Sequence, residues 1–345
     1  MTIDSIYKNR RVFLTGATGF KGSWLAYWLQ QLGAIVCGFS KNIPTEPNHF
    51  SLLDIRIEDH RDDINDFIML RNVLKKFEPE IVFHLAAQPL VRFSYDNPLE
   101  TFSTNIIGTA NLLQSITESE SVRAVIVITT DKVYKPQKHL TAYCESDQLG
   151  GYDPYSASKA CAELVVDSFR QSFFATKKTL LATARAGNVV GGGDWANGRL
   201  IPDLVRATIE GKTTTIRMPN AIRPWQHVLE PLHGYLLLGQ YLLEGKGEFA
   251  TSWNFGPAHD ENHSVKEIVQ LAKNYWDKIN FEIIPNNEKH EENFLMLDSN
   301  KSRTKLGWKP IWTLEQGIEQ TIKWYRNFYE KNQIQTLAQI KKYSQ

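Results

Sequence analysis

The feature that most constrains the fold is a glycine-rich turn near the start of the chain. In the segment RVFLTGATGFKGSWLAYWL, Gly16, Gly19 and Gly22 separate an apolar strand expected over 12–14 from a helix expected over 23–32. Glycine at such positions permits a tight turn, close approach of the backbone to a pyrophosphate and close packing of helix on strand. The helix N-terminus adds unpaired N–H groups and a positive dipole end. The segment therefore predicts a dinucleotide site.

Apolar segments without alternation recur through the first half of the chain. Expected strands lie at 12–14, 35–39, 81–85, 122–130 and 180–185, and expected helices at 67–76, 100–116 and 155–173. Strands that lack alternation are buried on both faces, which indicates a parallel sheet with helices on either side. The predicted fold class is α/β, a Rossmann-type doubly wound parallel sheet with a smaller C-terminal substrate-binding lobe.

The pattern becomes irregular and rich in glycine and proline after about residue 190. We predict a dinucleotide-binding domain over 1–190, with return segments around 228–256. Residues 191–330 are expected to form mainly a smaller lobe at the carboxyl edge of the sheet, where ligands of doubly wound folds bind. Residues 331–345 read as a polar tail.

Composition excludes several classes of partner. The chain has 39 basic and 38 acidic residues, so no net field favours nucleic acid or an anionic membrane. Its apolar stretches are far shorter than the ~20 residues that span a bilayer. Cys37, Cys144 and Cys161 lack metal-ligand spacing. The sequence therefore predicts a cytoplasmic protein with no bound metal.

A tyrosine and a lysine stand one helical turn apart in the segment DPYSASK. Asp153 can cap the helix and Pro154 suits its first turn, so Tyr155 and Lys159 share one face. A neighbouring ammonium and an oxidised nicotinamide ring both favour the phenolate, which can then take a proton from an alcohol as hydride leaves its carbon. Alone, the pair also fits the surface of an ordinary helix. The preceding glycine turn favours catalysis.

Polar residues follow the strand expected over 122–130. Thr130, Asp131 and Lys132 come at its carboxyl end, where the chemistry of a parallel sheet is expected. Thr130 could bind the same hydroxyl as Tyr155, and the next two residues supply an acid and a potential base. A solvated turn is the alternative interpretation of these charges.

Together with HLAAQ at 84–88, these motifs resemble the extended short-chain dehydrogenase/reductases that act on nucleotide sugars. The resemblance covers roughly residues 10–325. The long stretches at 184–203 and 222–238 are similar to the sugar-nucleotide 4,6-dehydratases, in particular to their CDP-glucose branch. This implies conversion of CDP-D-glucose to a 4-keto-6-deoxy sugar, with hydride moving from C4 to NAD and then to C6. Another nucleotide-sugar dehydratase or an epimerase is the alternative.

The resemblance also implies catalytic roles. Tyr155, with Thr130 and Lys159, would deprotonate the C4 hydroxyl, while Asp131 would protonate the departing C6 hydroxyl. Lys132 would remove the C5 proton, where dTDP-glucose relatives have glutamate. This base is a hypothesis that requires a pKa below the ordinary ~10.4. The loop after Lys132 departs from the CDP-glucose pattern, which leaves a related sugar open.

Cofactor and substrate contacts complete the prediction. The resemblance implies NAD, whereas Ser40 and Lys41 at the end of the second strand would also tolerate the 2′-phosphate of NADP. Expected cofactor contacts are Gly16, Thr18, Gly19, Phe20, Gly22, Ser40, Asp63, Ile64, Leu85, Ala86, Ala87, Gln88, Tyr155 and Lys159. Expected substrate contacts are Asn188, Arg199, Leu200, Arg217, Arg223 and His290. The arginine side chains suit phosphate oxygens.

A homodimer is expected from the helices at 100–116 and 155–173. They carry apolar residues beyond one stripe, namely Leu112, Leu113, Leu164, Val165, Val166, Phe173 and Phe174. In the superfamily the corresponding helices pair across a two-fold axis, so the resemblance implies the same here. Neither nucleic acid nor membrane is expected as a partner.

Overall fold

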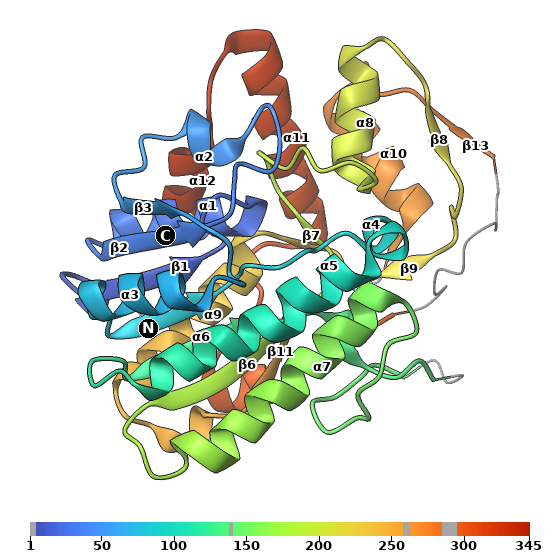
Figure 1. Cartoon of the computed structure of the whole chain (residues 1–345). Coiled ribbons are helices and arrows are strands. Elements are labelled where there is room, and N and C mark those ends of the chain that lie inside the picture. The colour runs from blue at the N-terminus through green and yellow to red at the C-terminus, as the bar shows by residue number, and fades with distance from the viewer. Residues whose placement is uncertain (1–4, 138–140, 258–262, 285–294) are drawn as a thin grey trace.

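The structure is a computed structural model that describes residues 5–137, 141–257, 263–284 and 295–345. A seven-stranded parallel sheet forms its centre, in the order β11-β6-β5-β4-β1-β2-β3 (Figure 1). The strands are β1 (Arg11–Thr15), β2 (Ile35–Ser40), β3 (Glu58–Arg61), β4 (Ile81–His84), β5 (Ala124–Ile128), β6 (Leu180–Ala186) and β11 (Ser252–Phe255). The predicted fold class is confirmed.

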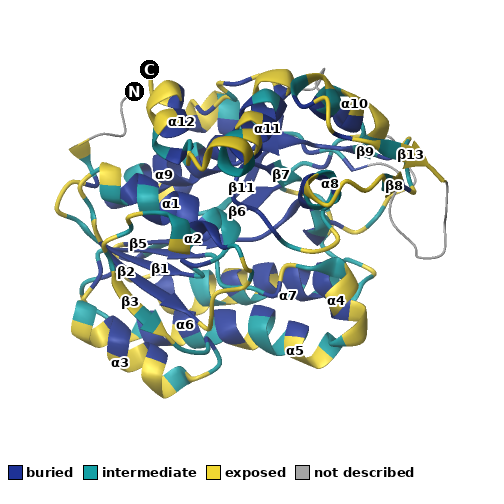
Figure 2. Cartoon of the chain, turned by 90° about the horizontal axis from the view of Figure 1, so that it is seen from above, coloured by how far each residue is buried: buried dark blue, intermediate teal, exposed yellow. Residues whose placement is uncertain are grey.

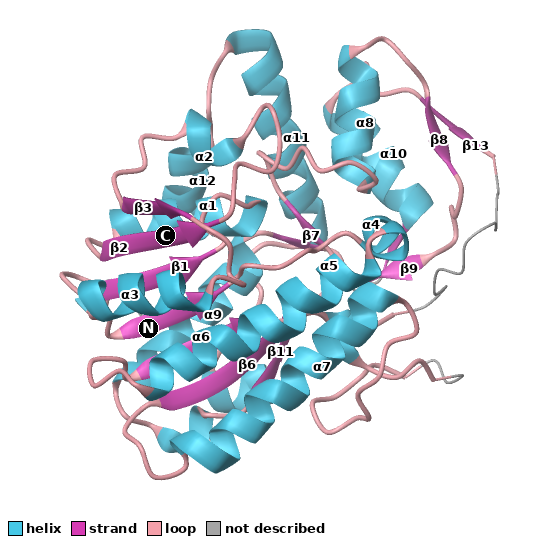
Figure 3. Cartoon of the chain, in the orientation of Figure 1, coloured by secondary structure: helices cyan, strands magenta, loops and turns pink. Residues whose placement is uncertain are grey.

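Helices cover both faces of this sheet (Figure 3). One face carries α3 (Phe67–Phe77), α5 (Pro98–Phe102), α6 (Gly108–Thr117) and α7 (Pro154–Phe169), with a π-helical turn joining α5 to α6. The other face carries α1 (Phe20–Gln31), α9 (Leu229–Leu243), α11 (Leu314–Lys331) and α12 (Thr336–Tyr343). Figure 2 shows these two layers with the buried sheet between them.

Strand residues alternate between two hydrophobic cores. Val12 and Leu14 of β1 belong to the larger core, whereas Phe13 belongs to the core under α3, α6 and α7. Every residue of β5, AVIVI, is buried. This explains why the strands read as continuous apolar runs, since neither face of the sheet meets solvent.

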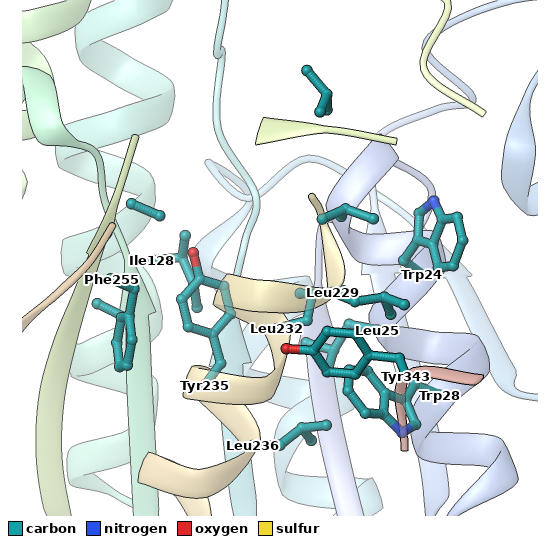
Figure 4. Close-up of a cluster of buried hydrophobic side chains, with 14 of the residues drawn as sticks. Trp24, Leu25, Trp28, Ile128, Leu229, Leu232, Tyr235, Leu236, Phe255 and Tyr343 are labelled. Carbon is teal, nitrogen blue, oxygen red and sulfur yellow. The ribbon is translucent and has the colours of Figure 1, made fainter. Parts of the chain in front are cut away.

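The chain returns to the sheet after leaving it. Helix α9 packs against β5 and β6, and β11 then adds the edge strand beside β6. The side chains of α9 are apolar nearly all round, as expected for a buried helix. Figure 4 shows Leu229 and Leu232 of α9 close to Leu25 of α1, and Leu236 and Trp24 belong to the same core. The expected division into domains stays a prediction.

A smaller group of elements lies beyond the carboxyl ends of the sheet strands (Figure 1). It contains α8 (Leu200–Ile209), α10 (Val265–Tyr275), the parallel pair β8 (Thr214–Ile216) and β13 (Phe281–Ile283), and the antiparallel pair β9 (Ile222–Arg223) and β12 (His263–Ser264). The parallel pair β7 (Val189–Val190) and β10 (Gln226–His227) lies between this group and the sheet. Two short helices, α2 (His49–Leu52) and α4 (Val91–Asp96), follow β2 and β4 in the chain.

The C-terminal segment, expected to be a polar tail with a helical pattern, forms a helix that packs on the rest of the protein. Residues 336–343 form α12, in which Thr336, Gln339, Ile340 and Tyr343 are buried. The Tyr343 hydroxyl donates a hydrogen bond to the carboxylate of Glu230 at 2.6 Å. Lys341 and Lys342 are exposed, whereas the polar residues Thr336 and Gln339 are buried, so composition alone did not reveal which side of this helix packs on the protein.

The helices expected to carry a dimer interface are apolar mainly for another reason. Leu112, Leu113, Val166 and Phe174 are buried within the subunit, and Val165 is partly buried against the same core. Only Leu164 and Phe173 of the named residues are strongly exposed, at 59% and 47%. The surplus of apolar residues thus reflects mostly the internal core.

Candidate active site

The glycine-rich turn joins β1 to α1 and fits a dinucleotide. Gly16 has φ +71°, and a Cβ there would lie 2.7 Å from the backbone nitrogen of Ala86. A Cβ on Gly22 would lie 2.0 Å from the carbonyl oxygen of Gly16. Gly19 is the N-cap of α1, and no side chain of the described residues caps it. The helix N-terminus is therefore left available to an anion.

Helix α7 begins as the sequence predicts. The Asp153 side chain accepts a hydrogen bond from the backbone of Ser156 at 2.9 Å, and Pro154 occupies the first turn. Tyr155 and Lys159 are both buried, at 8% and 6% exposure, and both line the cavity described below. The cap thus sets the start of the helix, and the helical spacing aligns the two side chains.

The three polar residues after β5 lie at the carboxyl edge of the sheet. Thr130 caps a short 3₁₀ turn (Asp131–Val133), and its hydroxyl donates to the carboxylate of Asp131 at 2.8 Å. The second carboxylate oxygen of Asp131 is buried and has no hydrogen-bond partner among the described residues. Burial raises the pKa of Asp131, although Lys132 and Thr130 act against this. A buried carboxyl with a raised pKa is suited to donate a proton.

A single cavity of about 1160 Å³ brings the candidate residues together. It is lined by every predicted catalytic residue and every predicted cofactor contact, and by Asn188, Arg199, Leu200, Arg217 and Arg223. His290 lies outside the described residues. The cavity runs from the glycine turn, past the ends of β4 and β5, to α8 and β8 of the smaller lobe. The fold thus brings predicted site residues that are far apart in the sequence to the wall of one cavity.

The electrostatics of Tyr155 differ from the expectation. Burial raises the pKa of Tyr155 to about 12, while a hydrogen bond with Thr130 and the charge of Arg199 lower it. Lys159 donates instead to the carbonyl oxygen of Ile128 at 3.2 Å. Burial also lowers the pKa of Lys159 to about 8. The sequence did not reveal this desolvation, which outweighs the charges of the protein on the phenol.

Arg199 and Arg223 both bond to other atoms of the protein. Arg199 precedes α8 and forms an ion pair with Asp194 at 2.8 Å. Arg223, in β9, is 7% exposed and donates to the carbonyl oxygen of Ile222 at 2.9 Å. Arg217 is exposed at the cavity, next to β8. A guanidinium has five donors, so each arginine keeps donors for a phosphate.

The residues after β2 bear on the choice of dinucleotide. Lys41 forms an ion pair with Asp63 at 3.0 Å, and Glu100 lies 3.9 Å from the same ammonium. The hydrogen bond and charge of Asp63 raise the pKa of Lys41. Ser40 accepts a hydrogen bond from the backbone of Thr18 at 3.3 Å. The ammonium of Lys41, which could favour a 2′-phosphate here, is thus balanced by two carboxylates.

The sequence reasoning missed Lys21. This residue lies in the first turn of α1 and lines the cavity. Burial lowers its pKa to about 8, with further contributions from Arg199 and Lys159 that lower it and from Asp131 that raises it. A lysine at a helix N-terminus is disfavoured by the dipole, and that placement is the signal that could have revealed it.

One group of potential metal ligands occurs among the described residues, away from the cavity. Cys37, Glu58 and His60 offer atoms within 4.8 Å of one another on β2 and β3. Burial and the charges of Glu58 and Asp59 raise the pKa of Cys37 to about 12, which disfavours the thiolate that binds metal. All three cysteines are free. The prediction that no metal is bound stays a prediction.

Comparison with known families decides the relationship of this chain. The family model described as GDP-mannose 4,6 dehydratase matches residues 13–321. The chain belongs to this family. The family is the one that the motifs around Gly16 and Tyr155 resembled, so the resemblance is confirmed.

Two individual relatives show which members of the family this chain is similar to. The chain is 46% identical to CDP-glucose 4,6-dehydratase of Salmonella typhimurium over 334 residues, which covers 94% of this chain and 93% of the relative. It is 28% identical to dTDP-glucose 4,6-dehydratase of Haemophilus influenzae, over 91% and 97% of the two chains.

Solved structures show the same fold. The dTDP-glucose 4,6-dehydratase of Streptomyces venezuelae, solved with NAD and TYD bound, superposes with a TM-score of 0.79 at 22% identity, covering 92% of this chain and 97% of the other. The UDP-glucose 4-epimerase of Thermotoga maritima, solved with UDP-glucose, gives 0.78 at 22% identity, over 92% and 99%. Because dehydratases and epimerases share this fold, the reaction must be argued from the cavity residues.

Within the described part of the chain, none of the helices combines the length and the apolar character needed to cross a bilayer.

Proposed function

We propose that this chain is a CDP-glucose 4,6-dehydratase, which converts CDP-D-glucose to CDP-4-keto-6-deoxy-D-glucose with loss of water. The observation that carries the proposal is the placement of Tyr155, Asp131 and Lys132 on one cavity that begins at a dinucleotide-type glycine turn. The 46% identity to CDP-glucose 4,6-dehydratase of Salmonella typhimurium, over almost the whole length of both chains, supports CDP-glucose in particular.

The residues of the chain divide the proton transfers among them. Tyr155 takes the proton of the C4 hydroxyl, and Thr130 holds the same hydroxyl by a hydrogen bond. Once C4 is a ketone, the C5–H bond is acidic, and Lys132 removes that proton. Asp131 donates a proton to the C6 hydroxyl, which leaves as water. The raised pKa of Asp131 suits this role, because a carboxyl that stays protonated to higher pH has a proton to give.

NAD is the proposed cofactor, and the residues of the turn fit it. The lack of room for a Cβ at Gly16 and Gly22 and the open N-terminus of α1 suit a diphosphate. The pairing of Lys41 with Asp63 argues against NADP, since the 2′-phosphate would meet two carboxylates. The chemistry that NAD supplies when bound is acceptance and return of one hydride, so the reaction has no net redox change.

The substrate is proposed to occupy the part of the cavity nearest the smaller lobe. Arg199, Arg217 and Arg223 can share the diphosphate charge, and Asn188 lies between β6 and β7 on the same wall. Leu200 begins α8 beside Arg199. His290 is kept as a proposed nucleotide contact.

We also propose a cytoplasmic homodimer. Leu99, Ile107 and Leu164 expose 82%, 53% and 59% of their surface on α5, the π-helical turn and α7. These elements form one outer layer of the molecule (Figure 2). Exposed apolar side chains gathered on one layer suit association with a second copy, which light scattering at micromolar concentration would detect.

The direct test is incubation of the purified chain and NAD with CDP-, dTDP-, UDP- and GDP-glucose. A 4-keto-6-deoxy product shows near-ultraviolet absorbance in alkali, and we expect it with CDP-glucose. Product from only one of the other sugars would refute the substrate, and formation of the C4 epimer without loss of water would refute the reaction.

A second test concerns Lys132. We expect Lys132→Ala to slow solvent deuterium incorporation at C5 by about 10²-fold or more. The exposed Lys135, three residues later in the same segment, gives a matched control, because Lys135→Ala should leave exchange unchanged. Near wild-type exchange in Lys132→Ala would remove Lys132 from the role of base.

A further inference from the structure

A buried polar network adjoins the cavity without lining it. Its centre is the ion pair between Glu163 of α7 and Arg185 of β6, whose N···O distance is 2.8 Å. The two side chains are only 2% and 4% exposed. Arg185 also donates to the hydroxyl of Tyr134 at 2.8 Å. None of these three residues is among those that line the cavity, so a role in direct ligand contact does not account for them.

The Glu163 carboxylate is held from several strands at once. It accepts hydrogen bonds from Thr129 at 2.5 Å and from Thr183 at 2.9 Å, in addition to the bond from Arg185. A buried carboxylate is costly unless donors satisfy it, and this one therefore has a single favourable orientation. Thr129 is the residue directly before Thr130, so one end of the network reaches the catalytic turn.

The other end of the network is Tyr134, which adjoins the C-terminal end of the same turn. Tyr134 follows the 3₁₀ turn Asp131–Val133, and its hydroxyl donates to Asn254 of β11 at 2.7 Å. Its ring stacks on Tyr143 with centroids 4.9 Å apart and an interplanar angle of 2°. Tyr134 is thus fixed by hydrogen bonds as well as by stacking.

The Thr130 hydroxyl binds the Asp131 carboxylate at 2.8 Å, but the bonds that the main-chain nitrogens of the turn make with Thr130 are long. The backbone nitrogen of Lys132 lies 3.4 Å from the hydroxyl of Thr130, and that of Val133 lies 3.4 Å from the Thr130 carbonyl oxygen. Bonds of this length contribute little. Gly150 adds one main-chain bond to the carbonyl oxygen of Val133 at 2.8 Å. The position of Asp131 and Lys132 therefore depends strongly on the two ends of the turn, and both ends are tied to the Glu163–Arg185 pair.

We propose that Glu163, Arg185 and Tyr134 are positioning residues that hold Asp131 and Lys132 in register with the substrate. The inference rests on the proposed function, because it assigns the network to the half of the reaction in which the C5 proton and the C6 hydroxyl leave. Tyr155 is placed by the Asp153 cap at the start of α7, about two turns before Glu163, whose charge also raises the pKa of Lys159. Tyr134 and Arg185 lie outside α7. Changes at these two residues are therefore expected to slow loss of the C5 proton more than oxidation at C4.

The test compares Tyr134→Phe with Tyr143→Phe in the full-length holoenzyme. Each change removes one hydroxyl from the stacked pair, but only that of Tyr134 bonds to Arg185. The probe is CDP-6-deoxyglucose, which can be oxidised at C4 but has no C6 hydroxyl to lose. The near-ultraviolet absorbance of reduced NAD reports C4 oxidation, and mass spectrometry in D₂O reports exchange at C5.

We expect Tyr134→Phe to slow C5 exchange and turnover of CDP-glucose by about 10-fold or more, because small displacements of a catalytic group cost that much. C4 oxidation should change less than about 2-fold, and Tyr143→Phe should retain both rates. Equal loss of both rates in Tyr134→Phe, or loss of neither, would overturn the proposal. Failure of the wild-type chain to oxidise the probe or turn over CDP-glucose would instead refute the proposed function.

Arg185→Lys provides a second variant should Tyr134→Phe fold poorly. It keeps a positive charge beside Glu163, but an ammonium cannot reproduce the two-sided contact of a guanidinium with Glu163 and Tyr134. The same split between C5 exchange and C4 oxidation is expected. A thermal melt that matches the wild type would show that the fold is intact. An equal loss of the C5 exchange rate and the C4 oxidation rate, or no loss of either, would again contradict the proposal.

Discussion

The ammonium of Lys159 donates a hydrogen bond to the main-chain carbonyl oxygen of Ile128, the last residue of β5, at 3.2 Å. This bond ties α7 to the strand that leads into Thr130 and Asp131. Burial lowers the pKa of Lys159 to about 8, whereas the carboxylate of Glu163, one turn along the helix, raises it. Lys159 therefore has two roles. It fixes α7 against β5, and it supplies a positive charge that favours the phenolate of Tyr155.

Replacing Lys159 with methionine should reduce turnover of CDP-glucose by about 10²-fold or more at neutral pH. The change removes the positive charge next to a tyrosine whose pKa burial raises to about 12. In the wild type the lysine is charged below its pKa, so its contribution should decline as the pH rises through about 8. Assays of 4-keto product from pH 6 to 9 would check both points. Lys178→Met, at an exposed position, is the control and should behave as the wild type.

Gly22→Ala should weaken NAD binding by at least about 10-fold. A Cβ at this position would lie 2.0 Å from the carbonyl oxygen of Gly16, so the backbone of the turn would have to move. Overpacking of this kind costs about 1–3 kcal/mol. Calorimetric titration with NAD measures the effect. Gly247→Ala is the matched control, since its nearest neighbour would be a Leu180 side-chain atom at 4.0 Å, and unchanged binding is expected there.

Lys21→Met should weaken binding of diphosphate ligands. The structure gives the ammonium of Lys21 no hydrogen bond or ion pair within the described residues, although it lines the cavity. A charged hydrogen bond contributes about 1.5–3 kcal/mol, which corresponds to roughly 10- to 100-fold in affinity. Separate titrations with NAD and with CDP-glucose would show which diphosphate it contacts. Unchanged affinity for both would exclude an anion-binding role for Lys21.

Acid should destabilise this protein through its buried histidines. Burial lowers the pKa of His49, His84 and His227 to about 3, below the value of about 6.5 expected in the unfolded chain. The unfolded state then binds more protons, so stability present above pH 6.5 is lost as the pH falls toward 3. Each histidine contributes a slope on the order of 1.4 kcal/mol per pH unit.

Urea unfolding between pH 7 and pH 5 would measure this loss. His49→Asn should be less stable at pH 7, because it disrupts the bonds of the ring with Ser23 and Thr336. It should also show a shallower dependence on pH than the wild type. A dependence as steep as that of the wild type would show that His49 is not the source.

Local features of the site were predictable from sequence because they depend on neighbouring residues. The cap by Asp153, the turn at Gly16 and the spacing of Tyr155 and Lys159 all follow from segments shorter than twenty residues. The buried strands were also predictable, because burial on both faces leaves a continuous apolar run, as in β5. The short strand β3, Glu58–Arg61, carries only polar residues and gave no such signal.

Features that depend on tertiary packing were not predictable. The bond of Lys159 to Ile128 and the pairing of Lys41 with Asp63 join residues that are far apart in the sequence. The raised pKa of Tyr155 likewise comes from burial, which only the folded chain creates. Composition misled for α12, where Tyr343 reaches Glu230, more than a hundred residues away.

Strand β11, which completes the edge of the sheet, has a consequence for any attempt to divide this chain. A fragment that ended near residue 190 would leave the backbone of β6 without its neighbour, and the apolar surface that α9 covers would meet water. Exposed strand edges beside apolar surface invite aggregation. The dinucleotide half is therefore expected to need residues up to about 255 for solubility, and a ribosome must synthesise that much before the sheet can close.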